Sequence, residues 1–435
     1  MKIERIKMSG GENYSVLLSS DGLPMPYPNL FVTLHHRNKS DASNTCYIAF
    51  EHLRYFYEIC SFLNIDLVER CRSGDFLKKK EMETIAKWAK STVKAFREHV
   101  AVNKAKNIIV LSPRKNKLET ARATLVINHR DDIESSTAYN RLTTFSKYVG
   151  WLEQEFFPSK KSTTEQKLQQ LRPRKYSPKG HSWDHDESYK SLTSPQVLRV
   201  LDVVRPDSPQ NPWKNESLRF RNQLIINMLE AIGFRRGELL KVRTEDIKTN
   251  PNNGLRYVKV RSEVDQYDER LDRPEGKTLG RLVPMDKRLA DMYDNYLINH
   301  RSNVNGAERI PYLFVTHHHR GSQPRALSSA AVNKLCREIS EVVGFRVHPH
   351  AFRHAWNDKF SAHADKRIAE GKTSESKSES DRQKLMGWSE GSRMAKTYSK
   401  RHDDKRAFEV GLELQEKDST KINSIVGAYD DDIDW

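Results

Sequence analysis

The sequence predicts a mainly helical protein with a small antiparallel β-sheet, divided into a helical domain and a mixed α/β domain. Three observations support this fold class. Apolar residues recur at intervals of three and four in both halves of the chain, which is typical of amphipathic helices. Short apolar runs typical of strands gather between residues 257 and 316, and a basic, Pro- and Ser-containing stretch separates the two halves. A chain of 435 residues is long enough for two such domains with their own cores.

The first predicted domain spans residues 44–157 and is helical. Apolar residues from Cys46 to Leu63 follow one helical face, a second helix is predicted over residues 80–100, and a third around residues 138–152. Residues 1–43 form an N-terminal extension, in which residues 30–34 are compatible with a short strand. Its role stays open between an arm that contacts DNA and a plain structural extension.

A basic linker is predicted over residues 158–187. Between Pro158 and His181 there are seven Lys or Arg residues against one Glu, with very few apolar residues. This composition suits a chain that wraps a nucleic-acid duplex, and it suits a merely solvated tether equally well.

The second predicted domain spans residues 188–412. It opens with a helix near Ser194, where Thr193 or Ser194 can cap the first turn, and a second buried helix ends at Gly233. Strands are predicted at residues 257–260, 281–284 and 312–316, and helices at 328–343 and from 351 onward. Insertions are predicted near 261–275 and 362–381, the latter flexible because it contains few apolar residues, and 413–435 is an acidic tail.

The charge balance narrows the class of partner. Lys and Arg total 74 against 58 acidic residues, a formal net charge of +16, which predicts a polyanionic partner such as nucleic acid. The four cysteines are widely spaced and are interpreted as reduced, mostly buried thiols. No apolar run is long enough for a membrane span and the first residues lack a signal-peptide pattern, so we expect a soluble, cytoplasmic protein that does not act at a membrane.

Five short segments contain the residues that can carry chemistry. In the segment from His350 to His354, two imidazoles flank Arg353, which combines proton carriers with a planar cation suited to phosphate oxygens. A helix that starts near His350 would place His350 and Arg353 on one face. The alternative, a metal-binding pair, lacks acidic or cysteine partners at zinc spacing, so no metal or cofactor is predicted.

The other segments have equally plain structural alternatives. Arg235 and Glu238 are three residues apart, so the carboxylate can orient the guanidinium, although a surface ion pair has the same spacing. Lys277 lies in a predicted turn before a strand, where a lysine is usually solvated but can also protonate a leaving oxygen. Trp388 and Tyr398 would ordinarily be core aromatics, but an indole donates a hydrogen bond and a tyrosine can act as a nucleophile.

The order and spacing of these residues resemble those of the tyrosine recombinase (phage-integrase) family over about residues 190–402. Gly233-Phe-Arg235 with Glu238 resembles the first arginine box, and Lys277, with Arg281-Leu-Val-Pro after it, resembles the β-hairpin lysine. His350-Ala-Phe-Arg353 resembles the second box, and Met386-Gly-Trp388 resembles the segment before the nucleophile, Tyr398. The ten-residue step from Trp388 to Tyr398 is one residue longer than the family pattern.

The resemblance implies a site-specific recombinase that cleaves and rejoins DNA through a 3′-phosphotyrosyl intermediate without metal or ATP. Tyr398 would attack phosphorus, Arg235 and Arg353 would hold the nonbridging oxygens, and Lys277 would protonate the leaving oxygen. Three further residues complete the implied site: His350 as a proton acceptor or donor, Trp388 as a hydrogen-bond donor or buttress, and Glu238 as the orienting group for Arg235.

The resemblance also implies the partners. Residues 44–157 would be the core-DNA-binding domain, and 188–412 the catalytic domain. Double-stranded DNA with specific recombination sites would be bound by a homo-tetramer near the nucleoid, with accessory DNA-bending or directionality proteins as further candidates, in the service of a mobile genetic element. Two alternatives stay open, a relaxing enzyme of the type IB topoisomerase kind and a catalytically silent DNA-binding protein of the same fold; recognition of RNA is disfavoured.

Overall fold

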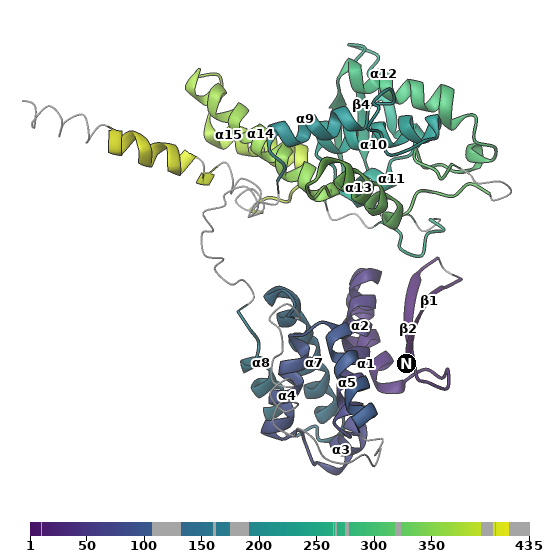
Figure 1. Cartoon of the computed structure of the whole chain (residues 1–435), viewed down its shortest axis with the longest axis vertical. Coiled ribbons are helices and arrows are strands. Elements are labelled where there is room, and N and C mark those ends of the chain that lie inside the picture. The colour runs from purple at the N-terminus through teal and green to yellow at the C-terminus, as the bar shows by residue number, and fades with distance from the viewer. Residues whose placement is uncertain are drawn as a thin grey trace, which may run out of the picture. The chain divides into compact units, whose positions relative to one another are not determined.

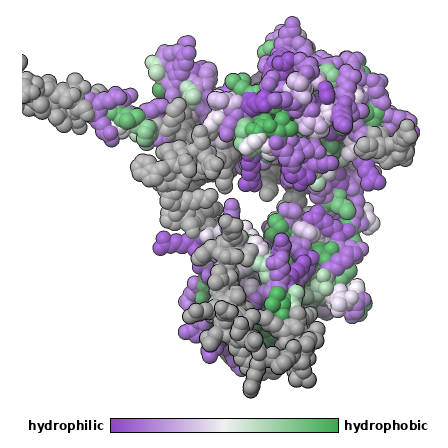
Figure 2. Space-filling model, in the orientation of Figure 1, coloured by the Kyte–Doolittle hydropathy of each residue, from purple (hydrophilic) through white to green (hydrophobic). Residues whose placement is uncertain are grey.

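A computed structural model describes residues 1–9, 11–106, 132–159, 162–174, 191–263, 265, 268–274, 278–317, 323–392, 403–404 and 406–416. The chain forms two compact units, Met1–Gly180 and His181–Trp435, and each is described by itself (Figure 1). Where Figure 2 colours the surface by hydropathy, it is predominantly hydrophilic, with small scattered apolar areas. Within the described ranges, every helix is too short or too polar to cross a membrane.

The N-terminal unit combines a β-hairpin with a helical bundle. Strands β1 (Lys2–Lys7) and β2 (Asn13–Leu18) pair in antiparallel fashion, with Lys2 opposite Leu18. The helices are α1 (Pro26–His35), α2 (Ser43–Phe62), α3 (Leu67–Ser73), α4 (Lys79–Ala89), α5 (Val93–Lys106), α7 (Ser135–Phe156) and α8 (Thr163–Gln170). The predicted helices at 44–63 and 138–152 are confirmed as α2 and α7.

The first 43 residues share one core with the helices that follow. Phe56 of α2 stacks on Phe145 of α7 with ring centroids 4.6 Å apart, and buried Leu17, Phe31 and Val32 join the same apolar cluster. The helical domain therefore includes the segment that the sequence set apart as an extension. The strand predicted at residues 30–34 is wrong, because this stretch lies in α1, whose first turn contains two prolines.

Two further predictions for this unit need correction. The helix predicted over residues 80–100 is interrupted after Ala89, and α5 starts anew at Val93, where the Thr92 hydroxyl accepts a hydrogen bond from the Ala95 amide at 3.2 Å. The predicted linker contains helix α8, which packs on α7 through the fully buried Leu168. Residues 175–190, the rest of that linker, lie outside the described part of the chain.

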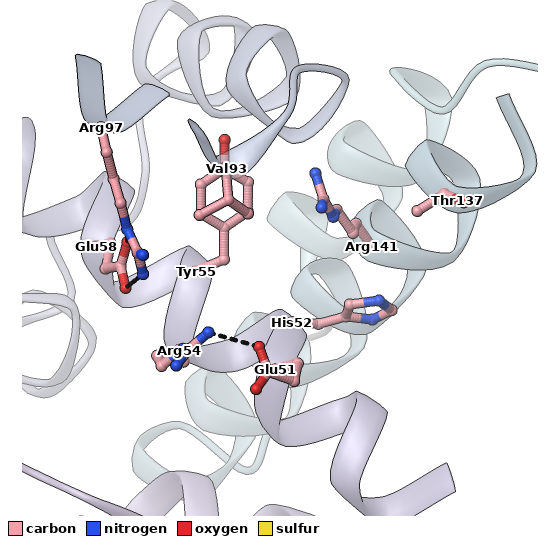
Figure 3. A pocket seen from close by; sticks show the side chains of 9 residues that line it. All are labelled: Glu51, His52, Arg54, Tyr55, Glu58, Val93, Arg97, Thr137 and Arg141. Atoms are coloured by element: carbon pink, nitrogen blue, oxygen red, sulfur yellow. Dashed lines mark hydrogen bonds and ion pairs between the residues drawn. The ribbon is translucent and has the colours of Figure 1, made fainter. Parts of the chain in front are cut away.

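A charged pocket of about 160 Å³ opens between α2, α5 and α7 of this unit (Figure 3). Arg54 and Arg97 in its wall are paired with Glu51 and Glu58. Arg141 instead donates to the carbonyl of Ser91 at 2.8 Å and lies over the Tyr55 ring, 4.9 Å from its centroid. The pocket therefore brings three guanidiniums and two carboxylates to one place.

The C-terminal unit is helical around a three-stranded sheet. Its helices are α9 (Ser194–Val203), α10 (Glu216–Ile232), α11 (Arg236–Lys241), α12 (Lys287–Asn295), η4 (Tyr296–Arg301), α13 (Ser329–Val343), α14 (Pro349–Ala369) and α15 (Glu375–Met386). Strands β3 (Ile247–Thr249), β4 (Arg256–Val260) and β5 (Arg281–Met285) form an antiparallel sheet in that order. The mainly helical fold class with a small antiparallel sheet is thus confirmed.

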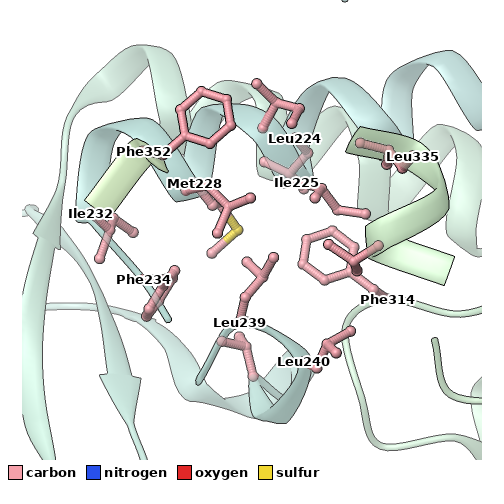
Figure 4. Packing of buried hydrophobic residues seen from close by; sticks show 14 of the residues in the cluster. Leu224, Ile225, Met228, Ile232, Phe234, Leu239, Leu240, Phe314, Leu335 and Phe352 are labelled. Carbon is pink, nitrogen blue, oxygen red and sulfur yellow. The ribbon is translucent and has the colours of Figure 1, made fainter. Parts of the chain in front are cut away.

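Helix α10 lies at the centre of the core of this unit. Its apolar side chains pack against residues of α11, α13 and α14, including Leu239, Leu335 and Phe352 (Figure 4). The helix ends at Gly233, which adopts a left-handed conformation with φ of +67°. This ending, predicted from the sequence, turns the chain from the core toward Arg235.

Of three further predictions for the C-terminal unit, two are wrong and one is confirmed. Residues 312–316 make isolated bridges rather than a strand, and β3 is the third strand of the sheet instead. The segment at 362–381, predicted to be flexible, is mostly helical, since α14 continues to Ala369 and α15 begins at Glu375. All four cysteines are free and buried, as the sequence predicted.

Candidate active site

A single buried carboxylate, Glu238 on α11, gathers three arginines. Its side chain is only 2% exposed. Arg281 Nη2 lies 2.8 Å from Glu238 Oε2, Arg235 Nη1 lies 3.3 Å from Oε1, and Arg353 Nη1 lies 3.7 Å from Oε2. The Thr278 hydroxyl donates to Oε1 at 2.6 Å. We call these five residues the Glu238 cluster.

Local sequence explains how Arg235 and Glu238 meet. Gly233 ends α10, and after Phe234 the chain enters α11 with Arg235 at the N-cap position. Glu238, at the third position of α11, accepts a hydrogen bond from the Arg235 amide at 3.1 Å in addition to the ion pair. The three-residue spacing therefore creates a capping contact and an orienting ion pair together, as the sequence predicted for the pair.

Arg353 enters the cluster from α14 and is completely buried. Its Nη1 donates to the carbonyl of Gly233 at 2.7 Å, and its Nη2 donates to the carbonyl of Met386 at 3.0 Å. Gly233 comes two residues before Arg235, and Met386 comes two residues before Trp388. Arg353 thus joins the chain segments that lead to two other predicted site residues.

The electrostatics of the cluster favour an anion. Burial opposes ionisation of Glu238, but the positive charges of Arg281 and Arg353 outweigh it and lower the pKa of the carboxyl to about 2. Glu238 is therefore ionised at neutral pH, and three guanidiniums still exceed one carboxylate. A site with this excess can hold a phosphodiester and the additional negative charge that develops when phosphorus is attacked.

Trp388 and His350 lie at the edge of this arrangement. The Trp388 side chain is buried beside Met386 and Trp356, and the Arg353 guanidinium carbon lies 5.9 Å from the centroid of its ring. His350 is exposed on the first turn of α14, with its ring centroid 4.9 Å from that of His354. The helix predicted from this motif is confirmed, with His350 and Arg353 three residues apart within one turn of α14.

The structure places five of the seven predicted site residues, because Lys277 and Tyr398 lie outside the described ranges. Thr278 and Arg281 are members of the cluster that sequence reasoning missed. In the sequence, Arg281 was noted only because it follows the predicted lysine, Lys277. Its partners Glu238 and Leu385 are distant along the chain, so no local sequence pattern identifies it. Among the described residues, no three His, Cys, Asp or Glu side chains are grouped as a metal site would require.

The sequence of this chain is similar to those of known proteins. Residues 190–405 match the family described as the phage integrase family. The chain is 25% identical over 170 residues to a tyrosine recombinase of Pseudothermotoga lettingae, an alignment that covers 38% of this chain and 50% of that protein. It is 26% identical over 167 residues to the tyrosine recombinase XerA of Pyrococcus furiosus, covering 38% and 46%. The chain thus spans about half the length of the curated relatives it matches.

Among solved structures, the chain is similar to the XerH site-specific recombinase bound to a palindromic difH substrate in a post-cleavage complex. The two are 15% identical, with a TM-score of 0.46, and the match covers 90% of this chain and 94% of the other. A structure of XerA recombinase matches with a TM-score of 0.33 at 15% identity, over 86% and 92% of the two chains.

Proposed function

The chain belongs to the tyrosine recombinase family, and from this premise we propose that it is a site-specific recombinase that cleaves and rejoins double-stranded DNA. One structural observation supports the proposal in addition to the family assignment. Arg235, Arg281 and Arg353 surround a single ionised carboxylate, Glu238, which leaves positive charge for a phosphodiester. A site of this kind can stabilise an attacked phosphate without a metal ion.

In the proposed reaction, Tyr398 attacks phosphorus and forms a 3′-phosphotyrosyl bond while the bond from phosphorus to the 5′-oxygen breaks. Arg235 and Arg353 bind the nonbridging oxygens, and Lys277 donates a proton to the leaving 5′-oxygen. His350 accepts or donates a proton near the phosphate, and Trp388 contributes a hydrogen bond or supports the phosphate. Because the phosphotyrosyl link conserves the energy of the broken bond, rejoining requires no ATP.

Both units would contact the duplex. The Arg-lined pocket of the N-terminal unit supports this, because Arg141 binds main-chain carbonyls whereas Arg54 and Arg97 are paired with carboxylates. The positive charge of Arg141 is therefore not neutralised by a carboxylate and can attract the phosphate backbone of DNA.

We further propose that the working form is a homo-tetramer on two DNA sites, acting for a mobile element in the cytoplasm near the nucleoid. Residues 406–416 are helical, and four apolar side chains on them are exposed: Phe408, Val410, Leu412 and Leu414. Such a helix fits a neighbouring subunit, and accessory DNA-bending or directionality proteins are the further candidate partners.

The deciding experiment uses nicked duplexes tiled across the DNA that flanks the gene. Wild type, Tyr398→Phe and the matched control Tyr429→Phe are incubated with each duplex, and a denaturing gel detects protein–DNA adducts. We expect an adduct with wild type and Tyr429→Phe that disappears with Tyr398→Phe. An adduct that survives Tyr398→Phe contradicts the assigned nucleophile.

Two companion assays, one with a supercoiled plasmid that carries the cleaved site and one on a native gel, separate the alternatives. An adduct accompanied by relaxation of supercoils, without strand exchange between two sites, would indicate a topoisomerase-like enzyme. Specific binding on a native gel without any adduct would indicate a silent DNA-binding protein of the same fold.

A further inference from the structure

Arg281, the first residue of β5, links three separate parts of the C-terminal unit with one guanidinium. Its Nη2 binds Glu238 at 2.8 Å, and its Nε donates to the carbonyl of Leu385 at 2.6 Å. Its Nη1 lies 3.4 Å from the Thr278 hydroxyl. The side chain is only 5% exposed, so these contacts are formed away from water, where each is strengthened.

Two further contacts hold the residues just before Arg281, one to Gly387 and one to Glu238. The Leu279 amide donates to the carbonyl of Gly387 at 2.9 Å, and the Thr278 hydroxyl donates to Glu238 at 2.6 Å. Residues 278–281 are therefore fixed to residues 385–387 by a main-chain hydrogen bond and by the Arg281 side chain. We call this set of contacts the Arg281 link.

Gly387 allows the two segments to approach so closely. It ends α15 with φ of +65°, a conformation that residues with a side chain rarely adopt. A Cβ atom at this position would lie 2.7 Å from the Leu279 carbonyl oxygen and 2.9 Å from Arg281 Nη1. Any other residue at position 387 would therefore push the link apart.

The two segments joined by the Arg281 link are each adjacent in sequence to a proposed site residue. Lys277, the proposed acid for the leaving oxygen, directly precedes Thr278, and Trp388 directly follows Gly387. Loss of the link would therefore shift the segment that follows Lys277 relative to the turn that carries Trp388. A displacement of about 1 Å in such a group can slow a reaction roughly 100-fold.

We propose that Arg281 is a positioning residue of DNA cleavage, which holds the segment after Lys277 against the Leu385–Gly387 turn through Glu238 and so places the leaving-group acid. This inference rests on the proposed function, because it assigns Arg281 to the proton donation by Lys277. It differs from a general structural role in one respect: the defect of an Arg281 variant should depend on the leaving group.

The chemistry of that dependence is explicit. With an ordinary duplex, the Tyr398 hydroxyl gives its proton to His350 and its oxygen bonds to phosphorus. The bond from phosphorus to the 5′-oxygen breaks, its electron pair goes to that oxygen, and Lys277 supplies the proton that this oxygen takes up. With a duplex whose scissile 5′-oxygen is replaced by sulfur, the leaving group is a thiolate. A thiol has a far lower pKa than an alcohol, so the sulfur leaves as a thiolate without a proton donor.

The test measures the rate of adduct formation at saturating full-length protein on matched oxygen and 5′-sulfur duplexes. The variants are Arg281→Lys, Arg281→Met and Gly387→Ala, and Lys277→Ala calibrates the loss of the acid. Arg256→Ala is the matched control, since Arg256 also pairs with a carboxylate, Asp294, but on another strand of the same sheet. Thermal unfolding and a native-gel titration of DNA accompany each variant.

We expect the three link variants to form adduct about 100-fold more slowly on the oxygen duplex and within about threefold of wild type on the sulfur duplex. Lys277→Ala should behave the same way, and Arg256→Ala should match wild type on both duplexes. Gly387→Ala reaches the link from its other side, so agreement with the Arg281 variants does not depend on the folding of any single variant.

Four outcomes overturn the inference. Equal defects on oxygen and sulfur duplexes would place the function of Arg281 in phosphate binding through Glu238, and normal rates on both would remove it from the reaction. Failure of the sulfur duplex to restore Lys277→Ala would contradict the acid itself, although wild-type adduct would still support the proposed function. No adduct with wild type on either duplex would contradict the proposed function, and the inference with it.

Discussion

Two groups of buried arginine contacts in the C-terminal unit differ in how far they reach along the chain. In the first, Arg301 of η4 donates to the carbonyls of four residues within 12 positions of itself, Ala307, Ile310, Tyr312 and Leu313. In the second, the Glu238 cluster, Arg353 binds the carbonyl of Gly233, 120 positions away, and Arg281 binds that of Leu385, 104 positions away.

The difference separates two uses of one side chain. Arg301 closes a local loop, and its donors are occupied by neutral carbonyls, so its loss should weaken folding without touching the chemistry. The cluster arginines hold segments from distant parts of the chain around an ionised Glu238, so their loss should change the reaction. Burial of an arginine alone therefore does not separate the two groups, whereas the shared, ionised Glu238 does.

Arg353→Ala should give the largest effect. It removes both the cation proposed to bind the phosphate and the junction between Gly233 and Met386, so adduct formation should fall by on the order of 100- to 1000-fold. Single-turnover rates on the nicked duplex, at protein concentrations that saturate DNA, measure this loss. A rate within tenfold of wild type would remove Arg353 from the phosphate site.

Arg301→Met should instead cost stability. Several carbonyls that now accept from the guanidinium would lose their donor, at a cost of about 3 kcal/mol in the free energy of unfolding. Urea unfolding of the full chain measures the change. The adduct rate per folded molecule should equal that of wild type, and a specific loss of rate would erase the distinction between the two groups.

Glu238 should make the cluster sensitive to acid. Its pKa falls from 4.5 to about 2 on folding, so it contributes stability that is fully present above pH 4.5 and is lost as the pH falls through about 2. The contribution amounts to about 3 kcal/mol. Urea midpoints measured from pH 6 to pH 2 should decline more steeply for wild type than for Glu238→Gln, with Glu308→Gln, an exposed carboxylate, as the control that keeps the wild-type slope.

Trp388→Phe should have the smallest effect, a roughly tenfold slower cleavage. Phenylalanine keeps the apolar packing beside Met386 and Trp356 but lacks the indole N–H, so the loss should correspond to one hydrogen bond. Trp388→His, which restores a donor, should recover part of the rate. Identical rates for wild type and Trp388→Phe would indicate that the residue acts only by packing.

Members of the Glu238 cluster could be predicted from the sequence only where their contacts are local or their spacing is distinctive. Arg235 and Glu238 share one turn of helix, and His350 and Arg353 share another, so their geometry follows from helical periodicity. Arg281 and Thr278 could not be identified in this way, because their partner Glu238 lies about 40 positions earlier and is reached only through the sheet. The contact of Arg281 with Glu238 depends on the pairing of β4 with β5, and no local sequence pattern predicts it.

The errors in the fold have similar causes. The break between α4 and α5 rests on the Thr92 hydroxyl, a contact that outweighs continuous helical periodicity. Leu17, Phe31 and Val32 complete a core whose other half begins at residue 44, so their burial is a tertiary property. The helices in 362–381 have few apolar residues, and their polar composition concealed regular structure.

The hairpin of α14 and α15 offers a practical consequence. Both ends that matter for the cluster, Arg353 and Met386, lie at its base, whereas its turn at Gly371 has φ of +68° and open space around it. Equal lengthening of both helices would leave the base in place. A fluorophore or affinity peptide inserted after Gly371 would therefore give a handle for testing the proposed assembly on DNA, one molecule at a time, without disturbing the Glu238 cluster.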